Sequence, residues 1–320
     1  MRLKIVHTKN GKTLYKDLDT GHWLPKDKAE AFIKQNKISD VREPNKEEQI
    51  RKAQEQAKAL NEQHTDPEPY KDILGPQEKN ADPIERLTKC KQEYIINNKY
   101  RDKNEEYYKY HKNCALCTTA GVLQARGYDV EAMPRDKSHW RGPGHVLEVD
   151  YSNTDNYIIG DSTHWSTGSP RYDKYSKKVT FKKDHNDTLK TFTPDKEPQF
   201  MPKGAKAAAE AITEKVKGWG NGAVGELSVC WKDTNKWHSI MISNDHGSVF
   251  IFDAQDNTVT TEIEHFLKDT FAKRTTLVRL DNASLRQDCQ NDLKKMVKPI
   301  DRSFGAAMKR LNNIPWEKIM

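Results

Sequence analysis

Short apolar runs concentrate in the middle of the chain, between about residues 107 and 280. Residues 114–126 predict a helix that ends at Gly127, and residues 203–217 predict a second helix. Runs of branched and aromatic residues predict strands over 128–132, 145–151, 156–160, 226–231, 238–243, 248–253 and 276–280. A helix followed by consecutive strands with short turns predicts an α+β fold with an antiparallel sheet.

The N-terminal part of the chain is more polar. Two short apolar runs flank Asn10-Gly11, which is a strong signal for a two-residue hairpin turn, and residues 26–35 predict a short helix. The chain from about residue 43 to 65 consists mainly of Lys, Glu, Gln and Ala, and prolines and a glycine follow it. This composition predicts a solvated helix or a flexible arm.

These changes in composition predict four regions. They are a small hairpin and helix unit (1–40), a charged helical or flexible linker (41–104), a main domain (105–290) with an insertion (136–202), and a basic C-terminal tail (291–320). Because the expected core positions lie beyond residue 104, a fragment that begins near residue 104 is expected to fold.

Composition limits the class of protein. Hydrophobic residues make up 35% and charged residues 32% of the 320 residues, so the chain is expected to bury a core, but not along its full length. No apolar run approaches the roughly 18 residues of a membrane helix, and the first residues lack the apolar segment of a signal peptide. We therefore expect a protein of the cytosol, or one that is exported or packaged by another route.

The formal net charge is +7, and the basic residues are spread widely. This pattern favours a solvated basic surface over a nucleic-acid footprint. Neither a membrane nor a nucleic acid is an expected partner.

The five cysteines are too few and too scattered for a disulfide framework, but Cys114 and Cys117 are closely spaced. Asn113 is expected to cap the helix, which places Cys114 in the first turn. Free backbone N–H groups and the positive end of the helix dipole stabilise a thiolate there, and the same N–H groups can bind an oxyanion. Cys117 lies deeper in the helix and is better placed for the core, so it is the alternative nucleophile.

His238 and Asp253 lie on two predicted strands joined by a tight turn. A two-residue turn at 245–246 places His238 opposite Asp253, whereas a turn at 246–247 places it diagonal to Asp253 and opposite Gln255. Both registers set an acid or an amide beside the imidazole, as a general base with an orienting partner requires. The rest of that strand face is apolar: Ile240, Ile242, Val249 and Ile251.

Two other arrangements are open from the residues alone. His145 and Asp161 flank strand-like sequence and form a weaker His–Asp pair. A zinc site would draw on Cys114 and Cys117 with two of His139, His145 and Cys230. Structural zinc sites usually show two closely spaced ligand pairs, and only one pair here has that spacing. No metal or cofactor is therefore expected.

Three blocks of sequence resemble one known family. The first runs from Asn113-Cys114-Ala-Leu-Cys117 through Arg126-Gly-Tyr-Asp-Val to Arg135, the second is 225–231, and the third comprises 238–242 and 247–255. Their order and spacing resemble the papain-fold toxin domain (Tox-PL), which occurs in bacterial polymorphic toxins and in phage or prophage proteins. The resemblance covers about 105–290.

This resemblance implies a papain-like core, in which a cysteine-bearing helix packs on an antiparallel sheet. It also implies a cysteine amidohydrolase, either a peptidase or a protein glutamine deamidase. In this family's pattern Cys114 is the nucleophile, His238 the base and Asp253 the residue that orients it.

Two further positions follow from the same resemblance. Asn113 and Gln255 are candidates for the substrate or oxyanion site, and Asn113-Cys114 resembles the start of other papain-like hydrolases, which favours Cys114 over Cys117. The chain departs from the family where Lys236-Trp237 precedes His238 and where Ala254 replaces a proline.

Two functions are compatible with these residues. The first is a catalytic toxin or effector that acts on a protein substrate and has an immunity protein as partner. The second is a phage or prophage virion or structural protein that retains the fold with little or no catalysis. The Cys114, His238 and Asp253 set favours the first.

Overall fold

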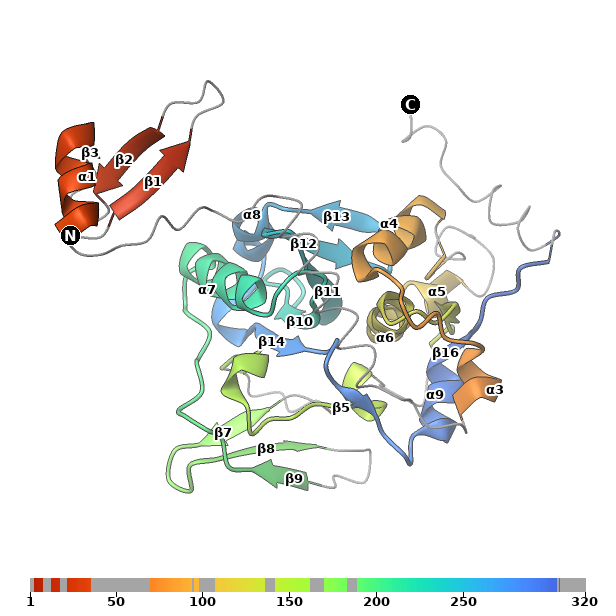
Figure 1. Cartoon of the computed structure of the whole chain (residues 1–320). Helices are drawn as coiled ribbons and strands as arrows, with labels where there is room; N and C mark the ends of the chain where they lie inside the picture. Colours follow the sequence, from red (N-terminus) through yellow and green to blue (C-terminus); the bar gives the residue numbers. More distant parts are fainter. Residues whose placement is uncertain are drawn as a thin grey trace. The chain divides into compact units, whose positions relative to one another are not determined.

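The computed structural model describes residues 3–7, 13–17, 22–35, 70–93, 95–97, 107–135, 142–161, 170–182, 189–303 and 305. The chain divides into two compact units, Met1–Gln49 and Ile50–Met320, and each is considered by itself (Figure 1).

The first unit contains strands β1 (Leu3–His7), β2 (Thr13–Asp17) and β3 (Trp23–Leu24), followed by helix α1 (Lys26–Gln35). The strands pair antiparallel in the order β1-β2-β3. The expected strand pair and helix are therefore present. The predicted turn residues Asn10 and Gly11 lie outside the described residues.

The second unit is built on a six-stranded antiparallel sheet, which confirms the α+β fold class. Its strand order is β13-β12-β11-β10-β14-β6. The bounds are β6 (Tyr157–Ile158), β10 (Val224–Cys230), β11 (Trp237–Asp245), β12 (Ser248–Asp253), β13 (Thr258–Thr260) and β14 (Thr276–Arg279).

The β11–β12 hairpin has the second of the two predicted registers. Met241 pairs with Phe252, and Asp245 pairs with Ser248, so His246 and Gly247 form the turn. Both turn residues have positive φ, 49° and 88°, as a two-residue turn that matches the strand twist requires.

Helices cover both faces of this sheet. Helix α6 (Cys114–Ala125) packs on the face that carries Met241 and Phe252. Helices α7 (Ala205–Gly218) and α8 (Ile263–Lys268) pack on the opposite face, which carries the apolar side chains predicted from the alternation: Ile240, Ile242, Val249 and Ile251. Figure 1 shows α7 beside α8, and α4 beside α6. The sheet thus separates two layers of core.

Residues 70–97 belong to the core on the α6 side, in contrast to the linker expected over 41–104. Helices α3 (Lys71–Leu74) and α4 (Pro83–Glu93) lie here. The buried side chains are Tyr70, Ile73, Leu74, Leu87, Cys90, Ile95 and Ile96. The apolar positions are few and widely spaced, so the polar majority of the segment conceals them. Residues 41–69 lie outside the described residues.

The expected insertion, 136–202, is joined to the main domain. It supplies the edge strand β6, which pairs with β14, and a separate three-stranded sheet of β7 (Arg171–Asp173), β8 (Lys178–Lys182) and β9 (Leu189–Phe192). Tyr151 connects the two parts, because its ring centroid lies 5.3 Å from that of Tyr157 and 4.9 Å from that of Phe181.

Part of the predicted strand 145–151 has a different structure. Pro143–His145 forms the 3-10 helix η2, and only Leu147–Glu148 forms a strand, β5, which pairs with β15 (Ser284–Leu285). The remaining short elements are helix α5 (Tyr107–Tyr110) and the 3-10 helices η3 (Thr154–Asn156) and η4 (Ala272–Arg274).

The start of the predicted basic tail is also structured. Helix α9 (Gln290–Met296) and strand β16 (Val297–Pro299) follow the last sheet residues, and β16 pairs with β4 (Val130–Ala132). Leu293, Met296 and Val297 are buried in the same core as α6. Apolar side chains at these positions therefore decide the structure of 290–299, despite the basic residues between them.

Among the described residues, none of the helices has the length and apolar character needed to cross a membrane.

The burial of α4 gives a direct test of whether this helix belongs to the core of the second unit. Leu87→Ala is expected to lower the free energy of unfolding by about 2–5 kcal/mol, because it removes a core side chain that is 3% exposed. Leu189→Ala, at a position 50% exposed, is the control and is expected to change it by less than about 0.5 kcal/mol. Urea unfolding measures both, and equal small effects would place α4 outside the core.

Candidate active site

Helix α6 and strand β11 run alongside each other, which sets the position of Cys114. Ser239 Oγ lies 3.0 Å from Thr118 Oγ1. One turn later Gly121 lies so close to the Met241 side chain that there is no space for a Cβ atom. Cys114 is one turn before Thr118, so it lies beside the start of β11, where His238 is found.

His238 and Asp253 are paired at the open end of the β11–β12 hairpin. His238 Nε2 lies 2.5 Å from Asp253 Oδ2, and the two side chains are 11% and 15% exposed. The other oxygen of this carboxylate accepts a hydrogen bond from the Gln255 backbone N–H at 3.0 Å. The diagonal register thus gives the His–Asp contact, and the turn after β12 fixes the carboxylate.

The third member, Cys114, is close enough to His238 for the thiol and the imidazole to influence each other. Since Asp253 occupies Nε2, the other ring nitrogen, Nδ1, is the one left for the thiol. Burial alone would lower the pKa of His238, but the hydrogen bonds to Asp253 and Cys114 outweigh it and raise the pKa to about 10. The protonated imidazole is therefore the favoured form between a carboxylate and a sulfur.

The two cysteines of α6 differ sharply in environment. Cys114 is partly exposed, whereas Cys117 is fully buried. Burial, with smaller contributions from Cys114 and Asp253, raises the pKa of the Cys117 thiol well above its usual value. The alternative nucleophile is thus enclosed in the core, and Cys114 is the reachable thiol of this pair.

Asn113 and Gln255 lie together, but their amides bond to the protein itself. Asn113 is fully buried and makes no side-chain cap, in contrast to the expectation. Its Nδ2 donates to Met133 O at 3.2 Å, and its Oδ1 accepts from Gln255 Nε2 at 3.3 Å. Asn113 is therefore too deep to touch a substrate, and the pair holds the start of α6 near the turn that follows Asp253.

Three more residues near the site had no predicted role. The Trp231 ring centroid lies 6.0 Å from that of His238. Arg135 is close enough to Cys114 for their charges to interact. Asn97 bonds to the loops on both sides of the site. Trp231 and Arg135 end two of the sequence blocks quoted above, whereas nothing in the sequence around Asn97 indicates a site.

The competing arrangements are not assembled in the same way. His145 is buried in η2, where its Nδ1 accepts a hydrogen bond from the Gly142 N–H at 3.1 Å. Asp161 is exposed and pairs with Lys273. His139 lies outside the described residues. Within the described part of the chain, no three His, Cys, Asp or Glu side chains are grouped to hold a metal ion.

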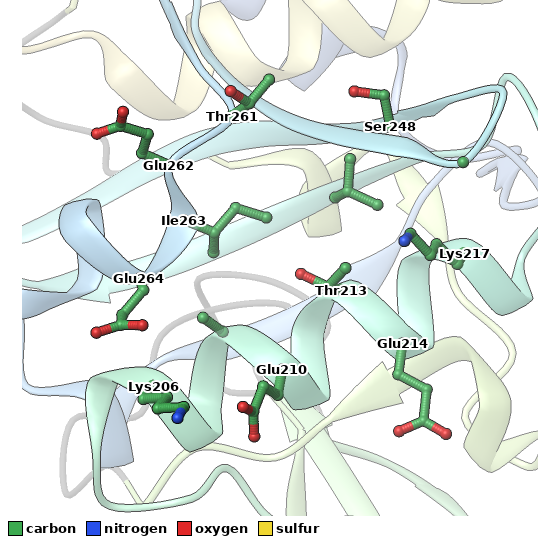
Figure 2. Close-up of a pocket in the computed structure, with 13 residues that line it drawn as sticks. Lys206, Glu210, Thr213, Glu214, Lys217, Ser248, Thr261, Glu262, Ile263 and Glu264 are labelled. Atoms are coloured by element: carbon green, nitrogen blue, oxygen red, sulfur yellow. The ribbon is translucent and has the colours of Figure 1, made fainter. Parts of the chain in front are cut away.

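A groove elsewhere on this unit has a different character. Figure 2 shows it between α7 and the segment from β12 to α8. Its lining residues are Lys206, Ala209, Glu210, Thr213, Glu214, Lys217, Gly247, Ser248, Val249, Thr261, Glu262, Ile263 and Glu264. None of the Cys114, His238 and Asp253 side chains lines it.

Comparison of the chain with protein-family models, with curated proteins and with solved structures found no match.

The contrast between the two cysteines predicts their reactivity. With limiting iodoacetamide near pH 6.5, Cys114 should be labelled before Cys117, because Cys117 is enclosed and its pKa is raised. Peptide mass spectrometry of the native protein measures this order. Preferential labelling of Cys117 would reverse the assignment of the nucleophile.

The raised pKa of His238 predicts a dependence of stability on pH. The protonated ring stabilises the folded protein below about pH 6.5, and this contribution is lost as the pH rises towards 10. The free energy of unfolding of the wild type, relative to that of His238→Gln, should therefore fall across this interval.

Urea unfolding at a series of pH values measures this difference. His246→Gln, in the turn of the same hairpin, is the matched control. A wild-type minus His238→Gln difference that stays constant with pH would show that His238 is not held protonated by its neighbours.

Proposed function

We propose that this protein is a papain-like cysteine amidohydrolase, a protein glutamine deamidase or peptidase, that acts as a toxin or effector. The observation that carries the proposal is the position of His238, which contacts Asp253 at 2.5 Å and is close enough to Cys114 to interact with its thiol. A thiol, an imidazole and a carboxylate in this order form the set that activates a cysteine nucleophile.

The first chemical step is attack by the Cys114 thiolate on the carbonyl carbon of an amide. The bond from sulfur to carbon forms, and negative charge develops on the carbonyl oxygen. At the start of α6, the Leu116 and Cys117 N–H groups donate to Asn113 O at 2.9 Å, so the N–H groups of Cys114 and Ala115, which precede them, are the donors that would stabilise that oxygen. The imidazolium of His238 then donates its proton to the leaving nitrogen as the carbon–nitrogen bond breaks.

The second step regenerates the enzyme. The leaving group is ammonia in a deamidase or an amine in a peptidase, and a thioester remains on Cys114. Neutral His238 removes a proton from water, which attacks the thioester and releases the carboxylic acid. Asp253 orients the imidazole in both steps, and the Trp231 ring packs near that of His238.

The arrangement of elements supports a papain-like core. A helix with a cysteine at its N-terminus packs on an antiparallel sheet, and the histidine and the carboxylate come from adjacent strands. The resemblance of residues 105–290 to the papain-fold toxin domain suggests the biological role. The alternative is a phage or prophage virion or structural protein that retains the fold with little or no catalysis, and in that case Cys114 need not be reactive.

A lysate treated with the purified protein tests the activity without a known substrate. Mass spectrometry of its proteins should reveal either glutamine residues that gain about 1 Da or new peptide termini. The first result identifies a deamidase and the second a peptidase. Cys114→Ala measures the background. If the wild type and Cys114→Ala cause changes of equal extent, the activity does not come from this site.

The proposed roles predict a pattern of losses among variants. Cys114→Ala should abolish turnover, and His238→Ala should lower it by about 10²–10⁴-fold. The double variant should be little worse than either, because the two residues act as one unit. Asp253→Ala should lose less than His238→Ala, since Asp253 orients and does not react.

The same variants need a control for folding. Circular dichroism should show that each variant keeps the secondary structure of the wild type, and urea unfolding should show that each variant is folded at the pH of the assay. His145→Ala is the comparison for activity. Full activity in folded His238→Ala, with loss in His145→Ala, would move the base to residue 145.

A further inference from the structure

A short segment outside the predicted domain reaches the site. After α4, Ile95 and Ile96 are buried in the α6 core, and the Ala132 N–H donates to Ile96 O at 2.8 Å. These contacts hold the next residue, Asn97, which is only 8% exposed. Its side chain is therefore presented from a fixed backbone.

The Asn97 amide contacts two loops that approach the site from different parts of the chain. Its Nδ2 donates to Gln255 O at 2.8 Å and to Tyr110 O at 3.0 Å. An amide nitrogen carries two hydrogens, so it satisfies one backbone carbonyl on each loop. The Asn113 amide lies within 3.3 Å as a further partner.

These two loops carry the two halves of the proposed catalytic set. The Tyr110 loop leads into α6 and its first residue, Cys114. The Gln255 loop holds Asp253 through its backbone N–H, and Asp253 holds His238. A change in the spacing of the loops therefore changes the spacing of sulfur and imidazole.

We propose that Asn97 is a positioning residue, which sets the distance between Cys114 and His238 by bridging the carbonyls of Tyr110 and Gln255. The inference rests on the proposed function, since it assigns a role towards that catalytic pair. The alternative is that Asn97 only satisfies buried carbonyls and contributes to stability alone. The two roles differ in what happens to the reactivity of Cys114 in a variant that still folds.

The test measures the rate at which iodoacetamide labels Cys114 at pH 6.5 in the full chain. Asn97→Asp removes both donated hydrogen bonds at nearly constant size, and Asn97→Ser leaves one shorter donor. In each variant, iodoacetamide should label Cys114 about 10–100-fold more slowly than in the wild type, at a rate that approaches that of His238→Gln. Small displacements of reacting groups lower reaction rates by such factors.

Asn156→Asp is the matched control. Asn156 is also buried, at 3% exposure, and its Nδ2 donates to Asp150 O at 2.9 Å in the segment around η3. The control loses a comparable buried amide, yet it should label Cys114 within about twofold of the wild type. Urea unfolding compares the stability of the three variants.

The outcomes separate this inference from the proposed function. If the wild type and His238→Gln label Cys114 equally, the proposed thiol–imidazole pair fails, and the role of Asn97 fails with it. If His238→Gln slows the labelling of Cys114 but folded Asn97 variants are labelled at the wild-type rate, only the positioning role is overturned. If both Asn97 variants unfold, buried Cys117 becomes labelled as well, and the role of Asn97 is structural only.

Discussion

The contact between α6 and β11 is the constraint on which the rest of the second unit depends. Gly121 lets the helix approach the Met241 side chain more closely than any residue with a Cβ would allow. Residues 116–125 are all buried, so this helix has no solvent face along most of its length. Such a helix cannot slide or rotate without opening the core on that side. Cys114 lies at the partly exposed end of this helix, so the packing of the core fixes its position.

Burial also decides the charge state of the groups around Cys114. Four of the five cysteines are buried, and burial raises the pKa of Cys117 and, to about 12, that of Cys90. Burial and the nearby charge of Asp253 raise the pKa of Asp256 too. Asp253, by contrast, has both a backbone N–H and an imidazole to stabilise its charge. Beside His238 there is thus one partly exposed thiol, that of Cys114, and one carboxylate that accepts hydrogen bonds from a backbone N–H and an imidazole, that of Asp253.

Sequence patterns predicted the elements that obey a simple periodicity. The alternation along β11 and β12 and the turn signal at Asp245-His246-Gly247 limited the register to two choices, and one of them is observed. The strands β15 and β16 are two and three residues long, which is too short for any periodicity. Residues 70–97 escaped notice because their apolar positions are sparse and pack only against elements distant in sequence. Asn97 gave no signal, since a single asparagine acquires its role only through tertiary contacts.

The candidate site is therefore a product of tertiary structure more than of any local motif. Its parts lie near residues 97, 114, 238 and 253, and each occupies its place because a different part of the core holds it there. In the proposed positioning role, the amide of Asn97 sets the spacing of these parts through the carbonyls of Tyr110 and Gln255 while the core persists. Reactivity and stability would then depend on different residues, although the buried helix α6 contributes to both.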